Sequence, residues 1–121
     1  MKIVIVGLTL VNCVFFLGCQ AGGISGSRAK TTHADNAYGL AKKFYHRGQY
    51  DKAIEYFEKY IDENADNTMY EIALYYLSKS YKNTQDYSNA LLNYQKLIDN
   101  KGDAFWIDLA KADMEEINLN R

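Results

Sequence analysis

The sequence predicts an all-α protein built from stacked helical hairpins, and three observations support this fold class. A pattern of aromatic and alanine residues recurs after 37 positions, apolar residues are spaced as on one face of a helix, and the 121-residue chain contains no proline. The repeat brings Tyr50, Ala53, Phe57 and Tyr60 into register with Tyr87, Ala90, Tyr94 and Leu97. A period of this length is typical of a solenoid, in which neighbouring hairpins bury a continuous core.

The N-terminal segment has the layout of a secretion signal. Lys2 is followed by an apolar run over residues 3–17, which ends at Gly18 and Cys19. A helix of this length would reach about 22 Å, short of the roughly 30 Å of a bilayer core. The sequence therefore predicts a cleaved signal peptide over residues 1–18, not a membrane-spanning helix.

Residues 15–19 (Phe-Phe-Leu-Gly-Cys) resemble a bacterial lipobox. The resemblance implies that Cys19 becomes the first mature residue and carries diacylglycerol and a further acyl chain such as palmitate, which together hold a protein stably on a bilayer. Cys13, after Asn12, is the competing position, and a cleaved signal with an incidental cysteine is a further alternative. Because these are the only two cysteines, no thiol chemistry is expected in the folded part.

Residues 19–36 are small and polar, and the sequence predicts a lipidated flexible tether there, with His33 solvated. Five helices are expected after it. The first covers about residues 35–47 and ends at Gly48, and the second covers about residues 50–63. Thr68 and Glu71 form a capping-box pattern that predicts the start of the third helix.

Asp86 and Asp103 are the expected first residues of the fourth and fifth helices. In the fifth helix Trp106 is expected to face the fourth, while acids form a polar outer side: Asp108, Asp113, Glu115 and Glu116. This acidic side is either a solvated face or a docking surface.

These residues resemble the tetratricopeptide repeat family. The matching pattern includes Leu40, Ala41, Phe44, Gly48, Tyr50, Ala53 and Phe57, and it recurs in Leu74, Leu77, Ser78, Tyr81, Tyr87, Ala90 and Tyr94. The resemblance implies a right-handed α-solenoid over residues 37–121, with repeats at about 34–67 and 71–102 and a capping helix at about 103–119. The chain departs from the family in lacking the usual proline and in its longer period.

In this family the first helix of each hairpin lines a concave groove, which implies a peptide-binding surface here. The positions carried over are Tyr38, Lys42, Tyr45, His46, Tyr75, Tyr76, Lys79, Lys82 and Asn83. Tyrosine gives contact area with a polar tip, and lysine gives a point charge, so the groove suits an extended peptide with aromatic side chains and a carboxylate. The alternative for each tyrosine is packing between hairpins.

Other classes of function find little support in the sequence. No nucleophile with an oriented base, metal cluster or phosphate-binding loop is recognisable, so we expect no enzyme, no metal and no cofactor beyond the lipid. With 14 basic and 15 acidic residues, the chain lacks the positive charge typical of nucleic-acid binding.

A lipidated pair of such hairpins resembles the BamD family of outer-membrane assembly lipoproteins over about residues 36–99. The resemblance implies an adaptor anchored in the outer membrane and facing the periplasm. Its implied partners are a BamA-type barrel protein and the C-terminal segments of outer-membrane proteins. The alternatives are a secretin pilotin, a coordinator of envelope division, or a non-catalytic subunit that stabilises a membrane enzyme or transporter.

Overall fold

Five α-helices make up the part of the chain that the computed structural model describes, residues 33–66 and 68–121. They are α2 (His33–His46), α3 (Tyr50–Glu63), α4 (Tyr70–Asn83), α5 (Tyr87–Asp99) and α6 (Ala104–Leu119). The expected signal peptide, Cys19 and the tether up to residue 32 lie outside these residues. The all-α prediction is confirmed for the described residues.

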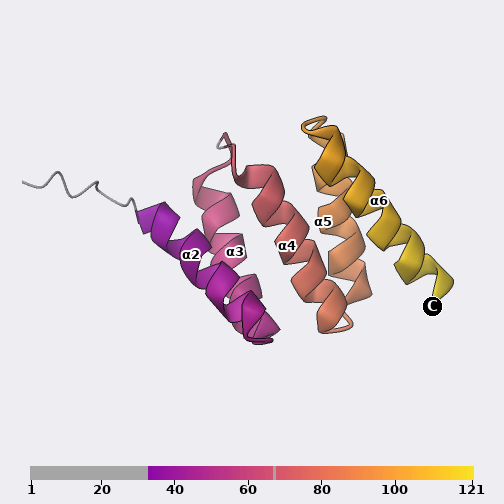
Figure 1. Ribbon diagram of the computed structural model, residues 1–121, viewed down its shortest axis with the longest axis horizontal. Helices are drawn as coiled ribbons and strands as arrows, with labels where there is room; N and C mark the ends of the chain where they lie inside the picture. Colours follow the sequence, from indigo (N-terminus) through magenta and orange to yellow (C-terminus); the bar gives the residue numbers. More distant parts are fainter. Residues whose placement is uncertain (1–32, 67) are drawn as a thin grey trace, which may run out of the picture. The chain divides into compact units, whose positions relative to one another are not determined.

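The helices form two hairpins and one further helix. Each helix packs on the next along the chain, and α4 also touches α2 and α6. In Figure 1, α2, α4 and α6 lie side by side in the front layer, with α3 and α5 behind them. The first helices of the hairpins therefore share one face with α6.

The core repeats the sequence pattern. Ala53 and Ala90 are completely buried, which allows the two helices of each hairpin to approach closely. Phe57 and Tyr94, 37 residues apart, are also completely buried. Two adjoining clusters result, one between α2, α3 and α4 and the other between α4, α5 and α6.

The turns inside the two hairpins also repeat each other. The Gln49 amide donates to the Phe44 carbonyl, and the Asp86 amide donates to the Tyr81 carbonyl, both at 2.9 Å. Gly48 has a φ of 73° and Gln85, at the equivalent position, has a φ of 65°. Glycine was the expected residue for such a helix end, and the second repeat places glutamine in the same left-handed conformation.

Two expected boundaries need correction. Helix α2 begins at His33, two residues before the expected helix start at about residue 35, so the helix extends into the expected tether. Helix α4 begins at Tyr70 with Met69 as its N-cap, one residue after the expected Thr68, and the Glu71 carboxylate accepts from Asn100 and the Asp103 amide instead of completing the predicted capping box, which is therefore wrong. Asp86 and Asp103 do cap α5 and α6, accepting from the Asn89 and Phe105 amides respectively.

Candidate protein-interaction face

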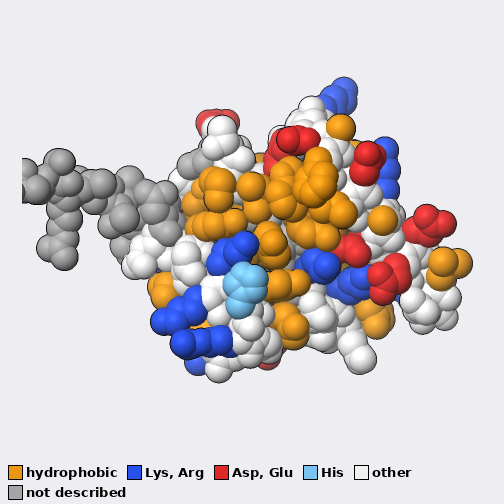
Figure 2. Space-filling model, viewed as in Figure 1, with side chains coloured by type: hydrophobic (Ala, Val, Ile, Leu, Met, Phe, Trp, Pro, Cys, Tyr) orange, Lys and Arg blue, Asp and Glu red, His pale blue; other side chains and the backbone are white. Residues whose placement is uncertain are grey.

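Aromatic rings run across the face formed by α2, α4 and α6. The ring centroid of Tyr45 lies 5.1 Å from that of Tyr76, Tyr76 lies 5.6 Å from Tyr75, and Tyr75 lies 5.3 Å from Trp106. We call these four residues the aromatic strip. Figure 2 shows hydrophobic side chains gathered on this face across the same helices. Tyr45, Tyr76 and Trp106 are partly exposed and suit contact with another protein chain, whereas Tyr75, which joins them in the row, is buried.

Lys42 stands at the α2 end of the aromatic strip. Its Nζ lies 4.1 Å from the centroid of the Tyr76 ring, within the range of cation–π attraction. His46, one turn further along α2, is exposed beside Tyr45, with ring centroids 5.8 Å apart. Among the side chains that the structure describes, in residues 36–66 and 68–121, the ion pairs join Lys79 and Lys82 to Asp113 and Glu116, and none of them involves Lys42. Lys42 therefore offers an uncompensated positive charge.

The two lysines of α4 have a different environment. Lys82 Nζ donates to Asp113 Oδ1 at 3.2 Å and to Glu116 Oε2 at 2.8 Å. Lys79 Nζ lies 4.0 Å from Asp113 Oδ2. The Tyr94 hydroxyl donates to the same carboxylate oxygen at 2.7 Å, from a fully buried ring. We call Lys82, Tyr94, Asp113 and Glu116 the α6 latch, since they join α6 to α4 and α5.

The latch shifts the titration of its members. Burial alone would raise the pKa of Asp113, but hydrogen bonds from Tyr94 and Lys82 and the nearby Lys79 charge outweigh it, and the net pKa is lowered. Burial alone would lower the pKa of Lys82, yet its bonds to Glu116 and Asp113 raise it overall. Burial, with Asp113 as hydrogen-bond partner and neighbouring charge, raises the pKa of Tyr94. All three therefore keep their neutral-pH protonation states.

The latch corrects the expected role of the acidic helix. Asp113 and Glu116 were expected on the outer side of α6, but they point back to α4, and the Asp113 side chain is only 14% exposed. The spacing of residues along α6 shows which of its faces is polar, but it does not show which acids lie next to a lysine of α4. Lys82, expected to offer a charge to a ligand, is instead already paired.

The remaining positions predicted for the groove divide between packing and exposure. Tyr75 is 7% exposed and packs in the second cluster, and Tyr38 lies against Phe57 and Tyr60 with centroids 6.0 and 5.3 Å away. Asn83 is exposed, and its amide Nδ2 donates to the Lys79 carbonyl. For Tyr38 and Tyr75, packing between helices accounts for much of their surface.

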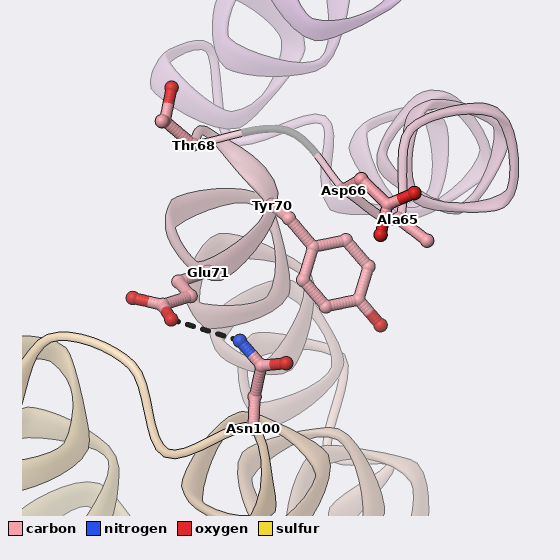
Figure 3. Close-up of a pocket in the computed structure, with 6 residues that line it drawn as sticks. All are labelled: Ala65, Asp66, Thr68, Tyr70, Glu71 and Asn100. Carbon is pink, nitrogen blue, oxygen red and sulfur yellow. Dashed lines mark hydrogen bonds between the residues drawn. The ribbon is translucent and has the colours of Figure 1, made fainter.

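A pocket of about 330 Å³ lies away from this face, between the α3–α4 connection and the turn after α5; Ala65, Asp66, Thr68, Tyr70, Glu71 and Asn100 line it. Figure 3 shows Glu71 at its edge, bonded to Asn100. The carboxylate accepts from Asn100 Nδ2 at 2.9 Å and from the Asp103 amide at 3.0 Å. It also occupies the space that a Cβ at Gly102 would need, so Gly102 allows this approach. Glu71 thus braces the turn instead of capping α4.

Comparison with known protein families decides what these hairpins are. The family model of the tetratricopeptide repeat matches residues 35–67 and 72–100, which correspond to α2 with α3 and to α4 with α5. The chain belongs to the tetratricopeptide repeat family. No curated protein and no solved structure matches it.

As a tetratricopeptide repeat domain, this chain has the architecture of a scaffold for protein–protein interaction. Helix α6 follows the second matched repeat and closes its core through Ala110 and Ile117, which are 0% and 2% exposed. Sequence reasoning found the two repeats and the aromatic character of their shared face. It did not find the contribution of α6 to that face through Trp106 and Asp113, since α6 lies outside the 37-residue pattern.

The described residues contain no group of three or more His, Cys, Asp or Glu that could hold a metal ion. None of the described helices has the length and apolar character needed to cross a membrane. The face of α2, α4 and α6 presents aromatic rings with the Lys42 ammonium group beside them.

Proposed function

We propose that this chain is a lipid-anchored tetratricopeptide adaptor that binds an extended segment of a partner protein across the aromatic strip. The observation that carries the proposal is the pairing of the strip with Lys42, whose charge no described carboxylate neutralises. An extended peptide can place side chains on the rings while a carboxylate meets the ammonium group. Lys79 and Lys82 suit that role less well, because Asp113 lies beside both.

The resemblance to BamD lipoproteins supplies the cellular setting of this proposal. Anchored through Cys19 and facing the periplasm from the outer membrane, the domain would take part in assembling β-barrel proteins. Its partners would be a BamA-type barrel protein and the C-terminal segments of outer-membrane proteins. An aromatic strip ending in a lysine fits a segment that carries aromatic residues and a terminal carboxylate.

A peptide-binding measurement tests the face. We expect Lys42→Glu to weaken binding of a peptide ending in phenylalanine with a free carboxylate by about tenfold, because a like charge replaces the attractive one. Lys43→Glu is the matched control, since Lys43 is the exposed neighbour of Lys42 on the same helix. The peptide amide should bind the unchanged protein weakly. Equal affinity of the acid and the amide, or an equal loss in both variants, would remove Lys42 from the site.

Two further experiments test the setting. Metabolic labelling with a fatty acid should label the unchanged chain and not Cys19→Ala, whereas label retained in that variant would move the anchor to Cys13. Purification of the tagged protein from membranes should recover a large barrel protein with periplasmic POTRA domains. Recovery of a secretin instead would replace the assembly role with that of a pilotin.

A further inference from the structure

A second apolar surface lies on the flank of α6 away from the aromatic strip. It is a pocket of about 490 Å³ between α5 and α6, whose apolar lining is Ile98, Met114 and Leu119. Leu119, in the last turn of α6, is 79% exposed. In Figure 1, α6 ends the row of helices, with α4 and α5 to one side of it.

The charged residues of this pocket are arranged in a self-complementary way. Lys111 and Glu115 are both exposed and line it one helical turn apart. Their side chains do not pair with each other: the ion pairs within residues 33–66 and 68–121 join Lys79 and Lys82 to Asp113 and Glu116. A lysine four residues before a glutamate is the less favourable order for pairing within one helix. Each charge is thus left for a group outside the helix.

An antiparallel copy of α6 satisfies both charges at once. Rotation about a two-fold axis beside position 113, midway between Lys111 and Glu115, reverses the helix direction, so Lys111 of one copy meets Glu115 of the other, and the reverse pair forms by symmetry. Met114 lies between Lys111 and Glu115 in each copy, so the apolar linings of the two pockets are brought together beside these pairs. The same antiparallel relation already exists inside the chain, where α5 packs on α4.

We propose that the α5–α6 pocket is closed by α6 of a second copy of this chain, in a two-fold symmetric dimer held by reciprocal Lys111–Glu115 pairs around an apolar seam. The aromatic strip lies on the opposite flank of α6, so it stays open in the dimer. A dimer would then present two strips to its partners, which raises avidity for a partner that carries two binding segments. The α6 latch holds the dimerising helix in place from the other side.

Charge reversal with two differently tagged full-length copies, expressed together, tests this dimer. Copies that both carry Lys111→Glu should co-purify about tenfold less than unchanged copies, and so should copies that both carry Glu115→Lys, because like charges then face each other. Pairing a Lys111→Glu copy with a Glu115→Lys copy restores both attractions and should restore co-purification. That restoration also shows that both variants fold.

The matched control uses the same pair of charges on α3. Glu55 and Lys59 are exposed and also one turn apart, so Glu55→Lys and Lys59→Glu change charge without touching the pocket. These variants should co-purify as the unchanged copies do. The dimer is overturned if unchanged copies do not co-purify, if the mixed pair stays as weak as the single variants, or if the α3 variants lose as much. If a different protein occupies this pocket, the mixed pair should stay as weak as the single variants.

Discussion

Replacing Asp113 with alanine should destabilise the domain more than replacing any other acidic residue of α6 with alanine. Its carboxylate accepts from the Tyr94 hydroxyl at 2.7 Å and from Lys82 Nζ at 3.2 Å. Within the described residues no buried side-chain polar atom lacks a hydrogen-bond partner, so the latch currently leaves nothing unsatisfied. Alanine at position 113 would leave the Tyr94 hydroxyl without its carboxylate acceptor.

The magnitude follows from what each partner loses. Tyr94 is 0% exposed, and a buried donor left without a partner costs about 1–3 kcal/mol. Lys82 keeps Glu116 at 2.8 Å and is partly exposed, so its loss adds less than about 1 kcal/mol. The expected loss is about 2–3 kcal/mol of unfolding free energy, which lowers the Tm of a domain of this size by about 10–20 °C.

Trp106 supplies the assay, because it is the only tryptophan and its ring packs on Tyr75 at 5.3 Å. Urea unfolding followed by its fluorescence measures the free energy for Asp113→Ala and for Asp108→Ala, an exposed acid on the same helix. A double-mutant cycle of Asp113→Ala with Tyr94→Phe isolates their mutual bond, and we expect a coupling of about 1–2 kcal/mol. If Asp113→Ala loses no more stability than Asp108→Ala, the latch does not hold α6.

Two other substitutions test the hairpin turns and the buried tyrosines. Gln85→Gly should stabilise the domain by about 1 kcal/mol in urea unfolding, because glycine adopts a φ of 65° without steric strain. Gly48→Ala should destabilise the domain by a similar amount, because alanine would be strained at a φ of 73°. If Gln85→Gly gives no gain in stability, Gln85 is unstrained. Burial, with the charges of nearby tyrosines, raises the pKa of Tyr38 to about 12, above its ordinary value of 10.0. Its contribution to stability is therefore complete below pH 10 and is lost as the pH rises toward 12. Unfolding free energies measured across this range should fall less steeply for Tyr38→Phe, and parallel curves would refute the assignment.

The sequence was sufficient to predict the hairpins because their determinants are local and occur twice. Ala53 and Ala90 are where helices approach, and both are completely buried. Phe57 and Tyr94 fill the space beside them, as the repeat indicated. A residue type that recurs at the same position of a period reports a packing requirement shared by both hairpins, so burial could be predicted without coordinates.

Contacts between elements of unlike sequence could not be predicted in this way. Glu71 matched a capping box with Thr68, but its carboxylate binds Asn100 and the Asp103 amide, about 30 positions away in the sequence. A local motif predicts only hydrogen bonds within its own helix. The turn after α5 offers Glu71 two donors, and nothing in the residues around Glu71 signals that turn.

Lys42 and Lys79 show most clearly how the repeat predicts position but not electrostatic environment. They are 37 residues apart, and each places its ammonium group over a tyrosine of α4, at 4.1 Å from the Tyr76 centroid and 5.5 Å from the Tyr75 centroid. The helix beside each lysine differs, however. Lys42 faces α4, which brings it a ring and no carboxylate among the described residues, whereas Lys79 faces α6 and Asp113.

The charge that a solenoid helix offers to a ligand is therefore set by the next helix of the same face, not by the helix that carries it. Here α6 supplies an acid, Asp113, that neutralises the lysines of α4, and Lys42 at the α2 end of the aromatic strip keeps its positive charge. Asp113→Asn tests this dependence directly. It should raise the affinity of the strip for a peptide carboxylate without altering any residue predicted to touch the peptide, since it removes the acid beside Lys79, while Lys82 stays paired with Glu116. If the affinity is unchanged, the acids of α6 do not influence the ligand, and the strip binds through its rings and Lys42 alone.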